Sequence, residues 1–236
     1  MIDKSFLEKI EAMSAQTITD IDGLAYSNKN LSLIVPPAAA RITVKSLSAI
    51  IDFCENEMEE GRHVLHIEGE DSVSLLGGMS FEFRRREHFV AAEAFTGNFQ
   101  FGNFLNVDKF IIALQAQFVQ DDTTAAILKL VGNMTKVSEV GTKDDGTTQR
   151  VEAKVGLAKV ENISVPNPVR LAPYRTFIEI DQPYSNFVLR LNSDHNCALF
   201  EADGGAWRIE AMQKIKTFLD NGLKSIGKRD QITILC

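Results

Sequence analysis

The pattern of apolar and polar side chains divides the chain into blocks of helix and blocks of strand. Apolar residues that recur every three or four positions mark one face of an amphipathic helix. This spacing predicts helices over residues 3–14, 43–60, 106–118, 121–134 and 205–221. Alternation with a period of two, and short apolar runs between turn residues, are typical of strands. They predict strands over residues 31–35, 63–68, 72–76, 80–94, 151–155, 177–180, 186–192, 198–201 and 231–235.

Residues that favour helix ends and turns separate these elements. The predicted helix ends are the caps Thr43, Asn106 and Asp121 or Asp122, and the terminating glycines Gly61 and Gly222. Glycines in segments 69–71 and 77–78 predict hairpin links between three successive strands. The polar run 141–148 is predicted to be a loop, because turn-forming residues fill it.

The order of these blocks predicts the fold class. Strands follow strands and helices follow helices, which is typical of an α+β protein with mainly antiparallel sheets. We expect an N-terminal helix, a central helix pair and a C-terminal helix around those sheets. The 236 residues form one predicted domain, in which a helix and meander half (1–140) precedes a strand-rich half (141–236). A chain of this length buries about 70% of its unfolded surface, so it needs no disulfide staples.

Composition and charge narrow the class of protein. The net charge of −7 argues against nonspecific nucleic-acid binding by the whole surface, although a local basic groove stays open. The three cysteines have no CxxC spacing and predict reduced thiols in a cytoplasmic protein. The N-terminus lacks the apolar core of a signal peptide. No stretch approaches the roughly 20 apolar residues that span a bilayer, so no membrane partner is expected.

A basic ridge is the first candidate site. In the predicted strand 80–94, Arg84, Arg86 and His88 share one face, whereas Arg85 lies on the other. Guanidinium groups in such a row bind phosphates or the acidic surface of a partner. The alternative is a solvated strand whose arginines pair with neighbouring glutamates. Three arginines fall short of the phosphate contacts that strong nucleic-acid binding needs.

Aromatic and proline residues form the second candidate, a subunit interface. It comprises Phe95, Phe99, Phe101, Phe104, Pro166 and Pro168. Phenylalanines this close together pack beneath a loop as a satellite core, contact a neighbouring subunit, or stack on bases. The prolines, followed by Pro173, suit an edge strand or a connecting arm rather than a central strand.

The third candidate is the turn that joins strand 198–201 to the last helix. Its residues are Asp203, Gly204, Gly205 and Trp207. Asp203 is predicted to cap the helix, and the glycines allow a sharp turn that leaves amides free at the helix start. Free amides bind anions, but the capping carboxylate already occupies that position. A structural turn with Trp207 as the helix anchor is therefore the favoured interpretation.

Catalytic and metal-binding motifs are missing from the sequence. Glu179, Asp181 and Glu201 are an acidic set that paired-carboxylate chemistry or Mg²⁺ binding would need, but no further ligands have diagnostic spacing. The four histidines lack zinc-site spacing, and neither a P-loop nor a GxSxG elbow is present. We therefore expect no catalytic residues, no metal and no cofactor. Solvated acids, or partners of Arg175 and Arg190, are the favoured interpretation of the acidic set.

Residues 173–219, from PYRTFIEIDQ to the end of MQKIKTFL, resemble the C-terminal part of a family of phage and prophage proteins of unknown function that includes the YfdQ protein. Residues 72–94 and the helix after Phe104 are also similar to it. The resemblance implies a protein of a mobile element in the bacterial host cytosol. It carries over no catalytic residue. The run 142–149 and the residues after Leu235 depart from the family pattern.

Two functional hypotheses follow from these observations. The first is a non-catalytic protein that self-assembles into a homo-oligomer through its phenylalanine-rich and proline-rich segments. The second is a nucleic-acid-binding accessory protein of phage replication, recombination or counter-defence, which would use the arginines at 84–86. An enzyme that acts on nucleotides ranks third, because the sequence offers no site for it.

Overall fold

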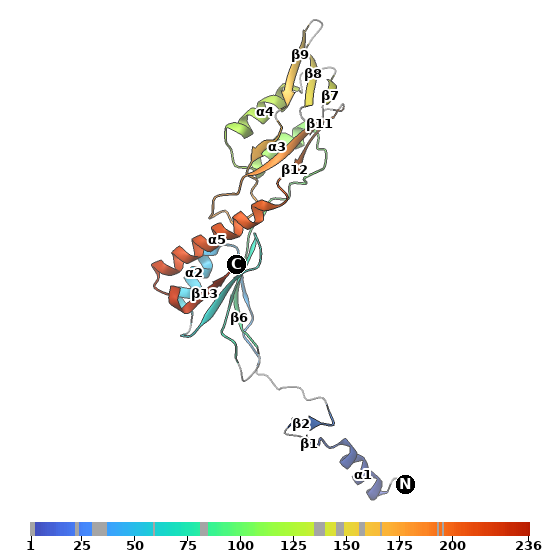
Figure 1. Cartoon of the computed structure of the whole chain (residues 1–236), viewed down its shortest axis with the longest axis vertical. Coiled ribbons are helices and arrows are strands. Elements are labelled where there is room, and N and C mark those ends of the chain that lie inside the picture. Colours follow the sequence, from blue (N-terminus) through green and yellow to red (C-terminus); the bar gives the residue numbers. More distant parts are fainter. Residues whose placement is uncertain are drawn as a thin grey trace. The chain divides into compact units, whose positions relative to one another are not determined.

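The computed structural model of the chain (Figure 1) is a mixed structure of helices and mostly antiparallel sheets, so the predicted α+β class is confirmed. It describes residues 3–21, 24–29, 37–58, 60–80, 85–134, 140–144, 149–155, 159–165, 167–192, 194 and 196–236. The chain divides into two compact units, one of residues 1–38 with 80–85 and one of residues 39–79 with 86–236. No helix of the described residues is both long and apolar enough to cross a membrane.

The first unit contains one helix and one hairpin. Helix α1 spans Lys4–Ser14, as its apolar spacing predicts. Strands β1 (Ile18–Ile21) and β2 (Leu24–Ser27) pair antiparallel, with Ile18 opposite Ser27. The sequence pattern does not predict this hairpin, because four-residue strands are too short to establish a period of two.

The second unit is built around a five-stranded mixed sheet. Its strands lie in the order β13 (Ile232–Leu235), β4 (His63–Ile67), β5 (Ser72–Leu76), β6 (His88–Glu93) and β3 (Ile42–Val44). The three central strands form the antiparallel meander that the hairpin signals predict. The two edge strands run parallel to their neighbours. Their partners are distant in the sequence, so no local pattern predicts these pairings.

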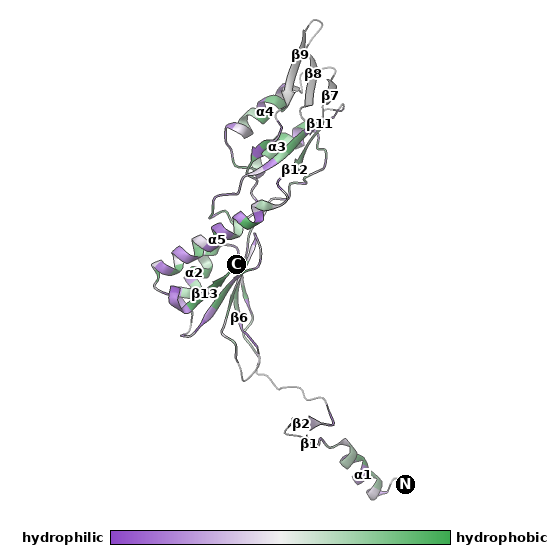
Figure 2. Ribbon diagram, viewed as in Figure 1, coloured by the Kyte–Doolittle hydropathy of each residue, from purple (hydrophilic) through white to green (hydrophobic). Residues whose placement is uncertain are grey.

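Two helices pack against this sheet and enclose the first hydrophobic core. Helix α2 spans Leu47–Asn56 and α5 spans Ala206–Ser225. Helix α5 buries one residue in every four, and Figure 2 shows hydrophilic residues along much of the rest of this helix. The core combines side chains of both helices and of the sheet, among them Leu47, Ile50, Leu65, Val73, Leu75, Ile215 and Leu219.

A second core lies between a helix pair and a three-stranded antiparallel sheet. The sheet order is β10 (Val169–Leu171), β11 (Ser185–Leu191) and β12 (Cys197–Glu201). Helices α3 (Val107–Gln117) and α4 (Asp122–Met134) supply the other side of the core. The sequence predicts both helix starts: the side chains of Asn106 and Asp121 accept hydrogen bonds from backbone amides of the first turns, at 2.9 and 2.8 Å.

A third sheet includes part of the segment 141–148, which the sequence predicts to be a loop. Strands β7 (Val140–Asp144), β8 (Gln149–Val155) and β9 (Lys159–Val165) form an antiparallel meander. Residues 141–144 therefore belong to a strand and not to a loop. Turn-forming side chains do not prevent a strand when backbone hydrogen bonds to a neighbour are available.

Three other predicted elements differ from the structure. Thr43 lies in β3, and Ser46 instead caps α2 by accepting a hydrogen bond from the Ala49 amide. Residues 177–180 form a turn and not a strand. Its apolar residues Phe177 and Ile180 are buried and hold the turn against the core. Strand β6 begins at His88 and not at residue 80. The predicted strand 31–35 lies outside the described residues.

Gly222 does not end the last helix but lies inside it, where α5 meets α2. A Cβ atom at this position would overlap Cδ1 of Ile51 and lie 3.0 Å from its Cγ1. The glycine therefore permits the close approach of the two helices. Local sequence cannot distinguish this role from a terminating glycine, because the partner helix is far away in the chain.

We expect Gly222→Ala to lower the free energy of unfolding by about 1 kcal/mol. Overpacking costs about 1–3 kcal/mol and exceeds the gain of about 1 kcal/mol in helix propensity. In the Ile51→Ala background the clash is absent, so the same substitution should raise stability by about 1 kcal/mol. Urea unfolding of the four proteins checks this sign change, and equal effects in both backgrounds would contradict the proposed contact.

Candidate functional site

The turn between β12 and α5 lies beside a buried arginine, Arg175. Its Nη1 donates to Glu201 Oε1 at 2.7 Å, and its Nη2 donates to Ser185 Oγ. Its guanidinium carbon lies 3.7 Å from the centroid of the Trp207 ring. Burial lowers the pKa of Arg175 to about 10, with Glu201 and Asp203 opposing the shift, so the group is cationic at neutral pH. These contacts tie the loop before β11 to the start of α5.

Asp203 and the two glycines shape the start of α5. Gly205, with a φ of 81°, is the N-cap residue, two positions after the predicted cap Asp203. The Asp203 carboxylate accepts a hydrogen bond from the Gly205 amide at 3.1 Å. Although burial opposes its ionisation, hydrogen bonds from Ser185 and Gly205 and the Arg175 cation lower the pKa of Asp203. The predicted helix cap is therefore wrong, because Asp203 bonds the amide of the N-cap residue Gly205 and no side chain of the described residues caps α5.

We expect Asp203→Asn to lower stability at pH 7 by about 1 kcal/mol, less than the roughly 1.5–3 kcal/mol of a hydrogen bond to a charged group, because Asp203 is only half-buried. The folded-state pKa of Asp203 is depressed, so its contribution is present above the unfolded value of about 4 and disappears as the pH falls through the folded value. Urea titrations of both proteins at neutral and acidic pH check this. A stability difference that stays constant with pH would contradict it.

The predicted acidic set does not converge. Glu179 accepts hydrogen bonds from the Leu47 and Ser48 amides at 2.5 and 2.8 Å and so satisfies the N-terminus of α2. Glu201 pairs with Arg175 instead, and the Asp181 carbonyl accepts from Lys214 at 3.2 Å. In the described part of the chain, no three histidine, cysteine, aspartate or glutamate residues gather as a metal-binding group.

The four phenylalanines of the candidate interface separate into two pairs. Phe99 and Phe101 pack against the second core, where Phe99 lies 5.1 Å from the Phe118 ring and Phe101 stacks on Phe187 at 5.2 Å. Phe95 and Phe104 are exposed. The interface stays a prediction, and the exposed pair is the part that a partner can reach.

The other predicted site residues lie apart from this turn. Arg86 and His88 are exposed, and the Arg86 guanidinium donates to the Gly77 carbonyl at 3.1 Å. Arg84 and Pro166 lie outside the described residues. Pro168 is exposed and precedes β10, an edge strand, as the prolines predict.

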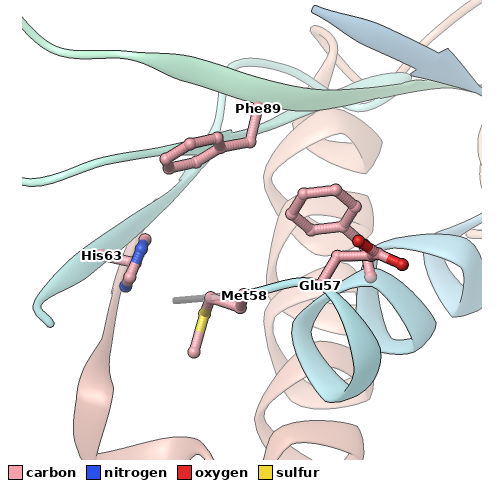
Figure 3. Close-up of a pocket in the computed structure, with 5 residues that line it drawn as sticks. Glu57, Met58, His63 and Phe89 are labelled. Atoms are coloured by element: carbon pink, nitrogen blue, oxygen red, sulfur yellow. The ribbon is translucent and has the colours of Figure 1, made fainter. Parts of the chain in front are cut away.

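A small pocket in the second unit was not predicted. Figure 3 shows Glu57 and Met58 at the end of α2, His63 at the start of β4, and Phe89 from β6 around it; Phe53 completes the lining. Its volume is about 80 Å³. The Phe89 ring lies 6.3 Å from the Phe53 ring and 5.6 Å from the His63 ring. The five residues come from three elements, so no sequence motif could reveal them.

Helix α1 exposes a row of large apolar side chains to solvent. Its apolar residues Phe6, Leu7, Ile10 and Met13 lie along the helix, and none of its residues is buried. Met13 is 76% exposed. The hairpin that follows also exposes Ile18, Ile21 and Tyr26. The amphipathic spacing is visible in the sequence, but the exposure of the apolar side chains of α1 is visible only in the structure.

Comparison with known proteins gives no relative. No family model, no curated protein and no solved structure matches this chain. The arrangement of helices and sheets places the chain in the α+β class, and its N-terminal helix is amphipathic and exposed. The resemblance to phage and prophage proteins stays a prediction.

Proposed function

We propose that this is a non-catalytic phage or prophage protein that self-assembles into a homo-oligomer through its N-terminal segment, residues 3–29. The observation that carries the proposal is α1, whose apolar residues are all exposed. Figure 2 shows hydrophobic residues along this helix. Exposed apolar residues that form a continuous stripe mark interaction surfaces more often than scattered ones do.

The elements of this segment are too small to be stable by themselves. Helix α1 has 11 residues, whereas isolated helices shorter than about 12–15 residues are marginal in water. A lone two-stranded hairpin is also marginal without further packing. A partner surface that covers Phe6, Ile10 and Met13 would supply the missing burial.

The charges of α1 favour a protein partner over a membrane. Helices that lie on membranes carry mainly lysine and arginine on the polar face. Here Lys4 and Lys9 are matched by Glu8 and Glu11, and Lys4 forms an i,i+4 ion pair with Glu8 at 3.6 Å. A balanced polar face offers no attraction to anionic lipid, and it remains soluble at the rim of a protein interface.

The test is the native mass by size-exclusion chromatography with light scattering. We expect the wild type to exceed the chain mass of 26.2 kDa several-fold as one discrete species, and Ile10→Lys to elute as a single chain. Ala12→Lys, which adds the same charge to the same helix at an exposed position on its polar face, is the matched control and should stay assembled. A wild type that is monomeric at micromolar concentration would contradict the proposal.

Absorbance at 260 and 280 nm in the same experiment tests the nucleic-acid alternative. Co-purified nucleic acid that high salt removes would favour that alternative, because phosphate contacts weaken steeply with salt. Arg86→Glu is then the first variant to make, since its side chain is exposed beside β6.

A further inference from the structure

The pocket between α2, β4 and β6 combines aromatic walls with a buried histidine. The rings of Phe53 and Phe89 have planes inclined by 29°, and the Met58 side chain adds a polarisable thioether. His63 is 5% exposed, and its Nδ1 lies 3.3 Å from the Gly61 carbonyl oxygen. Because a carbonyl oxygen only accepts, Nδ1 of the neutral ring carries the proton and Nε2 is the acceptor. The lining thus contains ring surfaces and one hydrogen-bond acceptor.

The charge around the pocket is negative. Glu57 belongs to the lining and is exposed, and in Figure 3 it lies on the α2 side, with His63 on the opposite side. Segment 55–62 contains four glutamates and one arginine, so its formal net charge is −3. The faces of aromatic rings carry the negative side of a quadrupole. These surroundings attract a cation and disfavour phosphates and carboxylates.

The volume of the pocket limits its ligand to a small group. A cavity of about 150 Å³ takes up benzene, which has six non-hydrogen atoms. The pocket measures about 80 Å³, and by the same proportion it takes up about three non-hydrogen atoms. Cofactors and drug-sized molecules need roughly 300–1,000 Å³. The pocket therefore fits a group of a few atoms that includes one positive charge.

We propose that this pocket binds the end of an alkylammonium chain, a nitrogen cation with two or three carbon atoms attached. The Phe53 and Phe89 rings contact the carbon atoms and attract the charge. Glu57 balances the charge, and Nε2 of His63 accepts a hydrogen bond from the ammonium group. The same group occurs in free alkylamines and at the end of a lysine side chain. The inference goes beyond the proposed self-assembly and does not rest on it, because the pocket belongs to the second unit and α1 to the first.

Titration of the full chain with matched ligands tests the proposal. The probe is n-propylammonium, and propan-1-ol and propionate are its neutral and anionic counterparts of similar size. The readout is the ¹³C-labelled methyl group of Met58 in NMR spectra at constant ionic strength, assigned by its absence in Met58→Leu. We expect a saturable shift with a Kd on the order of 1 mM for n-propylammonium, because only a few atoms contribute. Propan-1-ol should bind at least about fivefold more weakly, and propionate should give no saturable shift.

Two substitutions separate the charge from the ring surface. Glu57→Gln removes the charge and keeps the shape of the side chain, so it should weaken n-propylammonium about two- to fivefold. Glu55→Gln is the matched control, because it removes the same charge from an exposed position on α2, and it should leave the Kd nearly unchanged, since salt screens a charge farther from the ligand. Phe89→Leu keeps an apolar wall without a ring and should reduce the preference for n-propylammonium over propan-1-ol about two- to fivefold. Circular dichroism shows that each variant is folded.

A second titration distinguishes the two sources of the ammonium group. Nα-acetyl-lysine amide presents the end of a lysine side chain, and Nα-acetyl-norleucine amide is its uncharged counterpart. Tighter binding of the lysine derivative than of n-propylammonium assigns the pocket to a lysine of a peptide. Weaker binding of the lysine derivative assigns it to a free amine.

Three results would overturn the proposal. Equal affinities for n-propylammonium and propan-1-ol would show an apolar pocket that does not select for charge. Equal losses with Glu57→Gln and Glu55→Gln would remove Glu57 from the site, and the lack of any saturable shift would remove the site itself. None of these results changes the native mass, which tests the proposed self-assembly separately.

Discussion

Arg175→Met is expected to lower the free energy of unfolding by about 1.5–3 kcal/mol, the worth of hydrogen bonds to a charged group, because the guanidinium is buried while the Glu201 side chain stays 33% exposed. Arg175 is 7% exposed, and its loss would leave Glu201 and Asp203 without their cation. The stacking on Trp207 would also weaken, because methionine lacks the charge that the ring attracts. Chemical denaturation at neutral pH measures the effect.

Arg170→Met is the matched control. The Arg170 guanidinium also stacks on an aromatic ring, that of Tyr184 at 4.8 Å, but the residue is exposed, so its loss should cost less than about 1 kcal/mol. The double variant Arg175→Met/Glu201→Gln should recover part of the loss, since no unpaired charge stays at Glu201. Equal effects of the two arginine variants would show that burial of Arg175 contributes nothing.

Phe118→Ala is expected to lower the free energy of unfolding by about 3–5 kcal/mol through lost burial and a residual cavity. Phe118 is fully buried, and edge-to-face contacts join it to Phe99 at 5.1 Å and Phe101 at 6.4 Å. The backbone amide of Val119 donates to the Ala172 carbonyl beside it, at 2.9 Å. Loss of the ring should therefore also loosen the segment that follows β10. Hydrogen exchange in that segment is the second readout.

The substitution Phe95→Ala tests whether the Phe95 side chain contributes to the core of the chain or to contacts between chains. Phe95 is 69% exposed, with Lys45 5.4 Å above its ring, so its removal should change the stability of an isolated chain by less than about 0.5 kcal/mol. A fall in native mass on Phe95→Ala would add the phenylalanine segment to the assembly surface. An effect on unfolding as large as that of Phe118→Ala would contradict the distinction between the two residues.

Residues 174–182 form the loop that places Arg175 beside the β12–α5 turn. Phe177 and Ile180 belong to the first core, while Arg175 contacts Phe187 of the second core. Gln182 holds this loop in shape by accepting from the Arg175 amide at 3.1 Å and donating to the Phe177 carbonyl at 3.0 Å. One short loop thus connects both cores, and Gln182 satisfies buried backbone groups within it.

Short-range sequence patterns account for the local features of the fold. The helices at 4–14, 107–117 and 122–134, the start of the helix at 206, the caps Asn106 and Asp121, and the meander of β4 and β5 all follow from short-range periodicity and turn chemistry. These features depend on interactions within a few residues, so a single sequence contains the information. The α+β class follows from their order.

Contacts between residues that are far apart in the chain depend on packing and are not predictable from local patterns. The parallel edge strands β3 and β13, the approach of α2 at Gly222, the pairing of Arg175 with Glu201, and the pocket at Phe89 all join segments far apart in the chain. A buried turn such as 177–180 has the same apolar spacing as a strand, because burial and not backbone geometry sets that spacing. The stable set of such contacts is the one in which many side chains are buried and closely packed together. This sum over the whole fold cannot be seen in any short stretch of sequence.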